Sequence, residues 1–325
     1  MAHLNWGILG AAKFAREHMG PAIHLAKGAR LAALATSSPK KASAFQEFAP
    51  DITVHATYEA LLEDPSIDAV YIPLPNHLHV EWALKGMAAG KHVLVEKPAT
   101  LKAQEFDQLI AARDASKVLC AEAYMIVHHP QWQRAKALIG DGALGELKHI
   151  TGAFSFDNRA DVGNIRNRAE TGGGGLRDIG VYIFGSARFA TGLEPKMVSA
   201  RLRMEDGYDV FADVQAQFGQ ATYSAYCSTR MHPHQEMVFH GTKGVLRVQT
   251  PFNAGVFDQA RLELMQPDLG TRLERFPRAN QYVLQVEAFG HSVRTGADYG
   301  CPLEFSRGTQ EMIDWVLDHG VTLER

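Results

Sequence analysis

Three side chains have the chemistry to act on a hydroxyl or a carbonyl group: Lys97, Asp178 and Tyr182. Lys97 ends the apolar run of HVLVEKPAT, and Asp178 and Tyr182 stand four residues apart in GGGGLRDIGVYIF. Oxidation of a carbinol removes a hydride from carbon and a proton from oxygen, so it needs a donor to that oxygen and a group that exchanges the proton. A lysine supplies the donor, and a nearby cation lets a phenol, which titrates at about 10, exchange protons at neutral pH. We therefore predict that Lys97 and Tyr182 work as a pair.

Each of these residues also has a simpler interpretation. A helix that begins after the glycines at 172–175 would place Asp178 and Tyr182 on one face, where Asp178 could orient a substrate hydroxyl. A carboxylate near a helix N-terminus also complements the helix dipole without any catalytic role. The tripeptide EKP taken alone favours a surface lysine after a strand, and the chemistry of the other strand ends reverses that preference for Lys97. We predict Lys97, Tyr182 and Asp178 as the catalytic residues and assign neither Lys97 nor Tyr182 to a core.

The first part of the chain, residues 1–125, alternates short apolar, β-rich runs with helical patterns. Strands are expected at 4–10, 30–36, 53–56, 67–74, 91–96 and 117–123, and helices at 12–28, 39–49, 58–64, 77–90 and 103–116, the first of them interrupted near Pro21. Such alternation predicts βαβ units and hence a parallel sheet covered on both faces. The predicted fold class is α/β, with a doubly wound, dinucleotide-binding Rossmann domain at 1–125.

The second part, residues 126–325, has a different rhythm. Helices are expected at 129–142, 172–192, 280–296 and 306–320, and strands at 147–156, 196–204, 210–218, 221–229, 235–242, 244–250 and 261–266. Consecutive strands of this kind predict an α+β domain with an open, mostly antiparallel sheet that serves substrate binding and oligomerisation. An open sheet face would seek a partner, so we predict a homodimer or a higher homo-oligomer.

Composition excludes several classes of protein. The 325 residues carry a formal net charge of -3, which gives no sign of nucleic acid or a membrane surface as a partner. The cysteines at 120, 227 and 301 are odd in number and far apart, as in a protein of a reducing compartment. No apolar run approaches the ~20 residues that cross a bilayer, and the N-terminus lacks a basic leader. We therefore expect a cytoplasmic protein with a small-molecule ligand.

Ligands of an open parallel sheet bind beyond the carboxyl ends of its strands. The first such end is GILGAAKFA, residues 7–15, where Gly10 can make a tight turn and amides at the helix N-terminus can hold a pyrophosphate. The dinucleotide-binding pattern has glycine where Ala12 stands, whereas Ala15 fits its last position. An ordinary glycine turn would explain this segment equally well, so the motif alone leaves both interpretations open.

The second strand end is RLAALATSSPKK, residues 30–41. Sites for NAD usually place an acidic residue here for the ribose hydroxyls, whereas NADP needs neutral or basic groups around its 2′-phosphate. The segment from 36 to 41 contains no acid, and Ser37, Ser38 and Lys41 are suitable contacts. Lys40 and Lys41 could instead be solvated helix charges. We predict NADP as the cofactor, with NAD possible.

The segments GILGAAKFA, PLPNHLH, EKP and GGGGLRDIGVY, in this order, resemble the Gfo/Idh/MocA oxidoreductase family, and within it the branch of glucose–fructose oxidoreductase, xylose dehydrogenase and dihydrodiol dehydrogenase. The resemblance covers most of the chain. It implies a nicotinamide cofactor in a cleft between a Rossmann domain and an open-faced sheet, a dimer formed by that sheet, and a cis peptide bond before Pro98. Many family members carry histidine at the position of Tyr182, whereas the sugar- and diol-oxidising branch has tyrosine. By match to the family's motifs it also implies cofactor contacts by Gly10, Ala11, Ala12, Phe14, Leu74, Pro75, Asn76, His79, Glu96, Lys97, Arg166 and Tyr282.

A metal site has less support. The pairs His77 with His79, His128 with His129, and His232 with His234 invite such an interpretation, but histidines two apart diverge on a helix and no cysteine spacing accompanies them. We predict no metal.

Taken together, the sequence predicts an NADP-dependent oxidoreductase for a secondary hydroxyl or carbonyl of a sugar, polyol or cyclic diol. Two alternatives stay open: a glycosidase that uses tightly held NAD, and a sensor that binds nucleotide and sugar without turnover.

Overall fold

The computed structural model describes residues 3–161 and 163–324, which form two compact units. The first unit combines the chain up to residue 125 with 281–307, and the second combines 126–280 with the chain from 308 onward. The sequence places 281–307 in the second domain, but helix α8 (Gln281–Thr295) packs in the first unit, where the ring of Phe289 lies 5.0 Å from that of Trp6. Both rings are fully buried. The apolar pattern of a helix predicts a buried face but not which of two cores receives it.

The first unit is built on a parallel sheet of six strands in the order β3-β2-β1-β4-β5-β6, which confirms the predicted Rossmann fold. The strands are β1 (Leu4–Leu9), β2 (Ala29–Ala35), β3 (Thr53–His55), β4 (Ala69–Ile72), β5 (His92–Val95) and β6 (Cys120–Glu122). The helical segments are η1 (Ala15–Met19), α1 (Gly20–Leu25), α2 (Pro39–Gln46), α3 (Tyr58–Glu63), η2 (Asn76–Leu78), α4 (His79–Ala88), α5 (Glu105–Ser116), α8 and the start of α9 (Leu303–His319). One face of the sheet packs on α3, α4 and α5, and the other on α1 and α8.

Local sequence explains where several of these helices begin. Ser38 caps α2 with a hydroxyl that accepts from the amide of Lys41, and Pro39 follows it at the first helical position. Thr57 caps α3 in the same way. The predicted interruption near Pro21 is a π-helical turn, η1, that leads into α1, because Pro21 has no amide hydrogen to continue a regular α-helical pattern from the preceding turn.

The second unit contains a nine-stranded sheet in the order β14-β13-β12-β11-β7-β10-β9-β8-β15. Among the strands that the structure describes in this sheet, only the pairs β7 with β10 and β8 with β15 are parallel, so the prediction of a mostly antiparallel sheet is confirmed. The strands are β7 (Leu147–Asp157), β8 (Pro195–Glu205), β9 (Tyr208–Phe218), β10 (Ala221–Ser228), β11 (Arg230–Gly241), β12 (Val245–Gln249), β13 (Arg261–Gln266), β14 (Gly270–Arg275) and β15 (Val321–Thr322). Strand β14 was missed by the sequence analysis because nearly all of its residues are exposed and it has no alternating apolar pattern.

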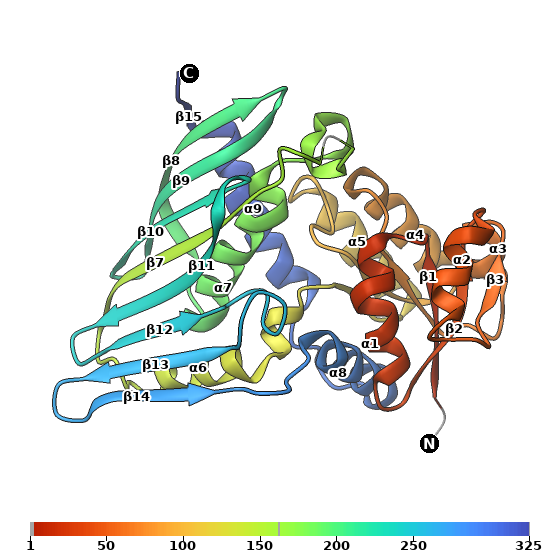
Figure 1. The fold of residues 1–325 in the computed structure, drawn as a ribbon, viewed down its shortest axis with the longest axis horizontal. Helices are drawn as coiled ribbons and strands as arrows, with labels where there is room; N and C mark the ends of the chain where they lie inside the picture. The colour runs from red at the N-terminus through yellow and green to blue at the C-terminus, as the bar shows by residue number, and fades with distance from the viewer. Residues whose placement is uncertain (1–2, 162, 325) are drawn as a thin grey trace. The chain divides into compact units, whose positions relative to one another are not determined.

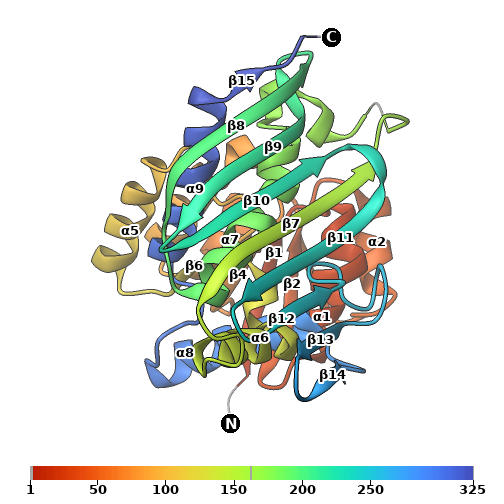
Figure 2. The same ribbon diagram turned by 90° about the vertical axis from the view of Figure 1, so that its left-hand side faces the viewer.

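Helices α6 (Pro130–Gly140) and α7 (Val181–Thr191) and the later part of α9 cover one face of this sheet (Figure 1). The short segments η3 (Met125–His128), η4 (Ile165–Asn167), η5 (Ala169–Thr171) and η6 (Leu176–Gly180) lie in the connections. Figure 2 shows the other face, which none of the described helices of this unit crosses. Within the described residues no helix is long and apolar enough to cross a bilayer.

Candidate active site

The turn after β1 has the backbone geometry of a nucleotide-binding turn. Gly10 has φ +99°, in the left-handed region that favours glycine, and a Cβ on it would lie 2.9 Å from Leu74 Cδ2. Its amide donates to the carbonyl of Ala35 over 3.0 Å, which joins the ends of β1 and β2. Ala11 and Ala12 are half-buried between this turn and the helix, and Ala15 is fully buried. The small residues at 12 and 15 therefore allow a close backbone approach although Ala12 departs from the glycine pattern.

Phe14 lies at the start of that helix in an aromatic cluster with His18 and Tyr282. The ring of Phe14 lies 5.0 Å from His18 and 5.6 Å from Tyr282. Burial raises the pKa of Tyr282 to about 12, and the charge of Glu96 adds to the effect. The structure thus places Tyr282, from near the C-terminal end of the sequence, close to Phe14 and Glu96.

The end of β2 presents polar groups to solvent. Ser37, Lys40 and Lys41 are exposed, while Ser38 is half-buried and caps α2. The amide of Ser38 donates to Thr36 Oγ1 over 3.2 Å, which curls the segment into the helix. The predicted 2′-phosphate contacts are therefore accessible at the N-terminus of a helix, whose dipole favours an anion.

The loops after β4 and β5 carry the remaining predicted contacts of the first unit. Leu74 is buried, Pro75 and Asn76 are half-buried, and Glu96 and Lys97 are half-buried at the carboxyl end of β5. The peptide bond between Lys97 and Pro98 is cis, as the family resemblance implies. His79 differs from its predicted role as a cofactor contact: it is 0% exposed, and both of its ring nitrogens face backbone carbonyl oxygens.

Both carboxylate oxygens of Glu96 accept hydrogen bonds at this edge. Tyr71 of β4, a residue that the sequence analysis missed, donates its hydroxyl to Glu96 Oε1 over 2.5 Å, and the amide of Lys97 donates to Oε2 over 3.1 Å. Burial raises the pKa of Glu96, while the bond from Tyr71 and the charge of Lys97 oppose that rise. Tyr71 is the penultimate residue of a fully buried strand, so its place in the apolar pattern does not distinguish it from an ordinary core residue.

In the second unit the glycine run is required by close packing. A Cβ on Gly173 would lie 2.5 Å from the carbonyl oxygen of Arg166, and one on Gly174 would lie 2.2 Å from Asp209 Oδ1. Gly174 also has φ +115°. The amides of Gly173 and Gly174 donate to the carbonyls of Arg168 and Arg166. The run therefore fastens the arginine-rich loop to the helix that carries Asp178 and Tyr182.

Asp209 is a second residue that the sequence analysis missed. It is 2% exposed, and its Oδ2 accepts from the amide of Leu176 over 2.7 Å, so that it caps the first turn of the helix that leads to Tyr182. Burial raises its pKa to about 6, while the amides of Leu176 and Gly175 and the charge of Arg177 act in the opposite direction. Asp209 lies 33 residues from Leu176, whose amide it accepts from, so no local sequence motif identifies it.

The second unit carries Arg166, Asp178 and Tyr182, of which the first two form an ion pair. Arg166 Nε lies 2.7 Å from Asp178 Oδ2, and Asp178 sits in the π-helical turn η6, one turn before Tyr182 in α7. Tyr182 is only 6% exposed, and its ring packs 5.8 Å from Phe154 and 5.5 Å from Phe252. The expectation that Tyr182 lies outside a core is therefore wrong, because the phenol ring belongs to an aromatic cluster behind the sheet.

The histidine pairs do not assemble a metal centre. Within the part of the chain that the structure describes, no three His, Cys, Asp or Glu side chains gather closely enough to hold a metal ion. His77 is exposed while His79 is buried, and His129 uses Nδ1 to accept from the amide of Gln131 at the start of α6.

Comparison with known proteins identifies the family. Residues 4–124 match the oxidoreductase family with an NAD-binding Rossmann fold, Gfo/Idh/MocA, and residues 132–247 match the Gfo/Idh/MocA C-terminal domain. The chain belongs to the Gfo/Idh/MocA oxidoreductase family. The resemblance carried by the four sequence segments is thereby confirmed.

Members of the Gfo/Idh/MocA family with named activities match along nearly the whole chain. A dTDP-3,4-didehydro-2,6-dideoxy-alpha-D-glucose 3-reductase of Saccharopolyspora spinosa is 33% identical over 94% of this chain and 92% of its own. A D-xylose 1-dehydrogenase (NADP(+)) of Haloferax volcanii is 32% identical over 98% of both chains. The structure of a 3-ketoreductase from Actinomadura kijaniata, in complex with NADP and TDP-benzene, superposes with a TM-score of 0.90 at 27% identity over 99% of both chains.

Proposed function

We propose that this Gfo/Idh/MocA protein is an NADP-dependent oxidoreductase that interconverts a secondary hydroxyl and a carbonyl on a sugar, a polyol or a cyclic diol. One observation carries the proposal: the carboxyl edge of the first sheet combines the Gly10 turn, a helix N-terminus after β2 without an acidic residue, and Lys97 after β5. The relatives that reduce a dTDP-keto sugar or oxidise D-xylose support the substrate class.

The residues of this edge fit NADP. The tight turn at Gly10, with φ +99°, precedes the helix whose N-terminal amides can hold a pyrophosphate, and the exposed Ser37, Lys40 and Lys41 suit a 2′-phosphate. Phe14 and Tyr282 would lie along the same nucleotide. NADP, when bound, supplies or accepts the hydride. The 3-ketoreductase of Actinomadura kijaniata with NADP supports this choice over NAD.

The protein's own groups then handle the oxygen and its proton. Lys97 donates to the substrate oxygen, and Tyr182 gives a proton to that oxygen in reduction and takes it in oxidation. Asp178, oriented by Arg166, accepts from a neighbouring substrate hydroxyl. The Actinomadura kijaniata enzyme has been solved with a tyrosine changed to phenylalanine and with a lysine changed to alanine, each in complex with TDP-benzene and NADP.

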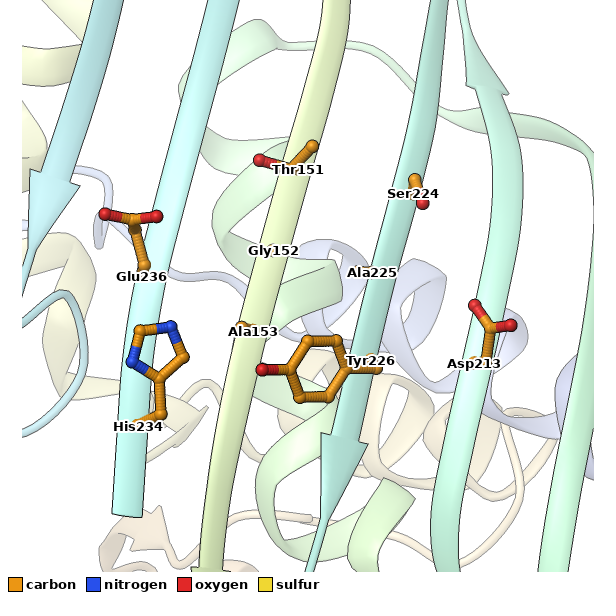
Figure 3. A pocket seen from close by; sticks show the side chains of 9 residues that line it. All are labelled: Thr151, Gly152, Ala153, Asp213, Ser224, Ala225, Tyr226, His234 and Glu236. Carbon is orange, nitrogen blue, oxygen red and sulfur yellow. The ribbon is translucent and has the colours of Figure 1, made fainter. Parts of the chain in front are cut away.

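We also propose that the face of the second sheet opposite α6 and α7, called the bare face, associates with a second copy of the chain. A pocket of ≈290 Å³ opens across strands β7, β9, β10 and β11 (Figure 3), and the residues that line it are small or polar. Asp213, Tyr226, His234 and Glu236 project around it. A flat face that mixes small residues with ionic groups suits a partly wet interface between identical chains.

A substrate panel tests the proposed reaction. The full-length protein is assayed with NADPH and keto sugars, and with NADP and aldoses, polyols and dihydrodiols, by the absorbance of the reduced cofactor. At least one pair should turn over, and Lys97→Met should lower that turnover while NADP still binds. An aryl glycoside belongs in the panel, because release of free sugar without net change in NADPH would instead establish a glycosidase.

A further inference from the structure

His79 joins the two loops that the proposed function uses. Its Nε2 lies 2.7 Å from the carbonyl oxygen of Leu74, in the loop after β4, and its Nδ1 lies 2.8 Å from the carbonyl oxygen of Pro98, next to Lys97. The side chain is 0% exposed. No atom of the ring is therefore available to touch a bound nucleotide or substrate.

The chemistry of this ring makes both contacts directional. Carbonyl oxygens only accept, so each contact needs an N–H on the facing nitrogen. Burial lowers the pKa of His79, the carbonyls of Pro98 and Leu74 raise it, and the charges of His77 and Lys97 lower it further. A neutral ring donates to one carbonyl at a time, and only an imidazolium donates to both, so that either form ties at least one loop to the start of α4.

The loop after β4, which contains Leu74, and the loop after β5, which contains Pro98, contact different parts of the proposed site. Leu74 lies against the Gly10 turn, since a Cβ at Gly10 would approach Leu74 Cδ2 to 2.9 Å, and Asn76 follows two residues later. Pro98 follows Lys97 directly, and the next amide, that of Ala99, donates to the buried Glu122 over 2.8 Å. A shift of Leu74 would disturb the nucleotide turn, whereas a shift of Pro98 would disturb the lysine.

We propose that His79 is a positioning residue with two separable functions: a hydrogen on Nδ1 sets Lys97 through the Pro98 carbonyl, and a hydrogen on Nε2 sets the nucleotide-binding loop through the Leu74 carbonyl. The inference rests on the proposed function, in which Lys97 meets the substrate oxygen and the β4 loop meets NADP.

Two substitutions separate these functions. In His79→Asn the amide nitrogen takes the place of Nδ1 and keeps the donor to Pro98, whereas in His79→Gln it takes the place of Nε2 and keeps the donor to Leu74. His79→Asn should keep kcat within about threefold and raise the Kd for NADP about tenfold, the usual weight of one lost hydrogen bond. His79→Gln should keep the Kd and lower kcat about tenfold.

His92 is the matched control. It stands at the opposite end of β5, where its Nδ1 accepts from the amide of Leu119 over 2.9 Å. His92→Gln should lower the unfolding midpoint, but it should not change one of the two quantities, kcat or the NADP Kd, while leaving the other unchanged. Parallel changes of kcat and Kd in both His79 variants, or no change in either, would overturn the inference.

The NADP titration keeps this test independent of the proposed reaction. If the wild-type protein turned over no substrate of the panel, the proposed function would fail, yet the Asn and Gln variants should still differ in NADP Kd. If both variants failed to fold, amide hydrogen exchange on the wild-type protein would decide. Residues 74–79 and 97–100 should open together, and independent opening of the two segments would refute the link.

Discussion

Arg166 and Asp178 form an ion pair in which Arg166 Nε lies 2.7 Å from Asp178 Oδ2, with the aspartate side chain only 10% exposed. The carboxylate is thereby held in one direction by a cation from the arginine-rich loop, which the glycine run fastens in place. Arg166 thus acts on Asp178, a role in addition to the cofactor contact that the family resemblance implies.

Loss of the Asp178 charge should impair the reaction without unfolding the protein. We expect Asp178→Asn to lower kcat/KM by about 10- to 100-fold, since a hydrogen bond to a charged group is worth about 1.5–3 kcal/mol. The matched control is Asp157→Asn, which breaks an ion pair with Arg159 of the same length, 2.7 Å, on an exposed surface. Steady-state kinetics of both variants check the prediction. If Asp178→Asn and Asp157→Asn had equal kcat/KM values, Asp178 would have no role in the reaction.

Tyr182→Phe keeps the ring in its aromatic cluster and deletes the exchangeable proton. Turnover should fall by about 10²–10⁴-fold with little change in NADP affinity. Lys97→Met should also lower turnover, and the double variant should lose far less than the product of the two single losses, because the groups act as a unit. Single-turnover kinetics measure the three values. Near-normal turnover of Tyr182→Phe would leave Lys97 to exchange the proton alone or through water.

NADP should bind more tightly than NAD, because the end of β2 offers serines and lysines but no carboxylate. Ser37→Asp should reverse this preference, since a carboxylate repels the 2′-phosphate and accepts from ribose hydroxyls. Lys41→Met should weaken NADP more than NAD, whereas Lys117→Asn, at an exposed lysine beyond α5, should change neither. Fluorescence titration of the apo protein with both nucleotides decides the matter, and tighter binding of NAD by the wild type would refute the assignment.

Acid should destabilise the fold partly through His129. Burial lowers the pKa of His129 to about 4, against about 6.5 in an unfolded chain, so the unfolded state takes up the proton first. Its stabilising contribution is complete above about pH 6.5 and is lost at about 1 kcal/mol per pH unit as the pH falls toward 4. His129→Asn keeps an acceptor for the amide of Gln131 and cannot titrate, so its urea midpoint should fall less between pH 7.5 and pH 5 than that of the wild type. Asp209, with its raised pKa, acts in the opposite direction in both proteins and cancels in the comparison.

Self-association through the bare sheet face should be visible at micromolar concentration. Light scattering should give a dimer or a higher oligomer, and Ala153→Arg, at the pocket of Figure 3, should reduce it to a monomer. Ala297→Arg, on an exposed loop of the other unit, is the control and should leave the mass unchanged. A wild-type protein that stays monomeric would contradict the proposal.

The sequence by itself determined the fold class and most of the secondary structure. Alternating β-rich and helical runs predicted the parallel sheet, and period-two patterns predicted the antiparallel one, since burial of one or both faces imposes those periods. The sequence prediction missed β14, because its exposed residues show no alternating apolar pattern. It also assigned 281–307 to the wrong unit, because the apolar face of a helix shows that the helix is buried but not which core it packs against. The strand-end motifs placed the predicted contacts of the first unit along a single edge of its sheet.

Only the tertiary structure decided what several of these residues do. His79 is fully buried and clamps Leu74 and Pro98, Asp209 caps the helix that leads to Tyr182, and Tyr71 holds Glu96. Each contact joins groups 19 or more residues apart, apart from the five-residue link between His79 and Leu74. Local spacing reports the period of a helix or a strand, whereas the partner of a buried polar group is set by how separate segments pack, and no pattern within one segment encodes that choice.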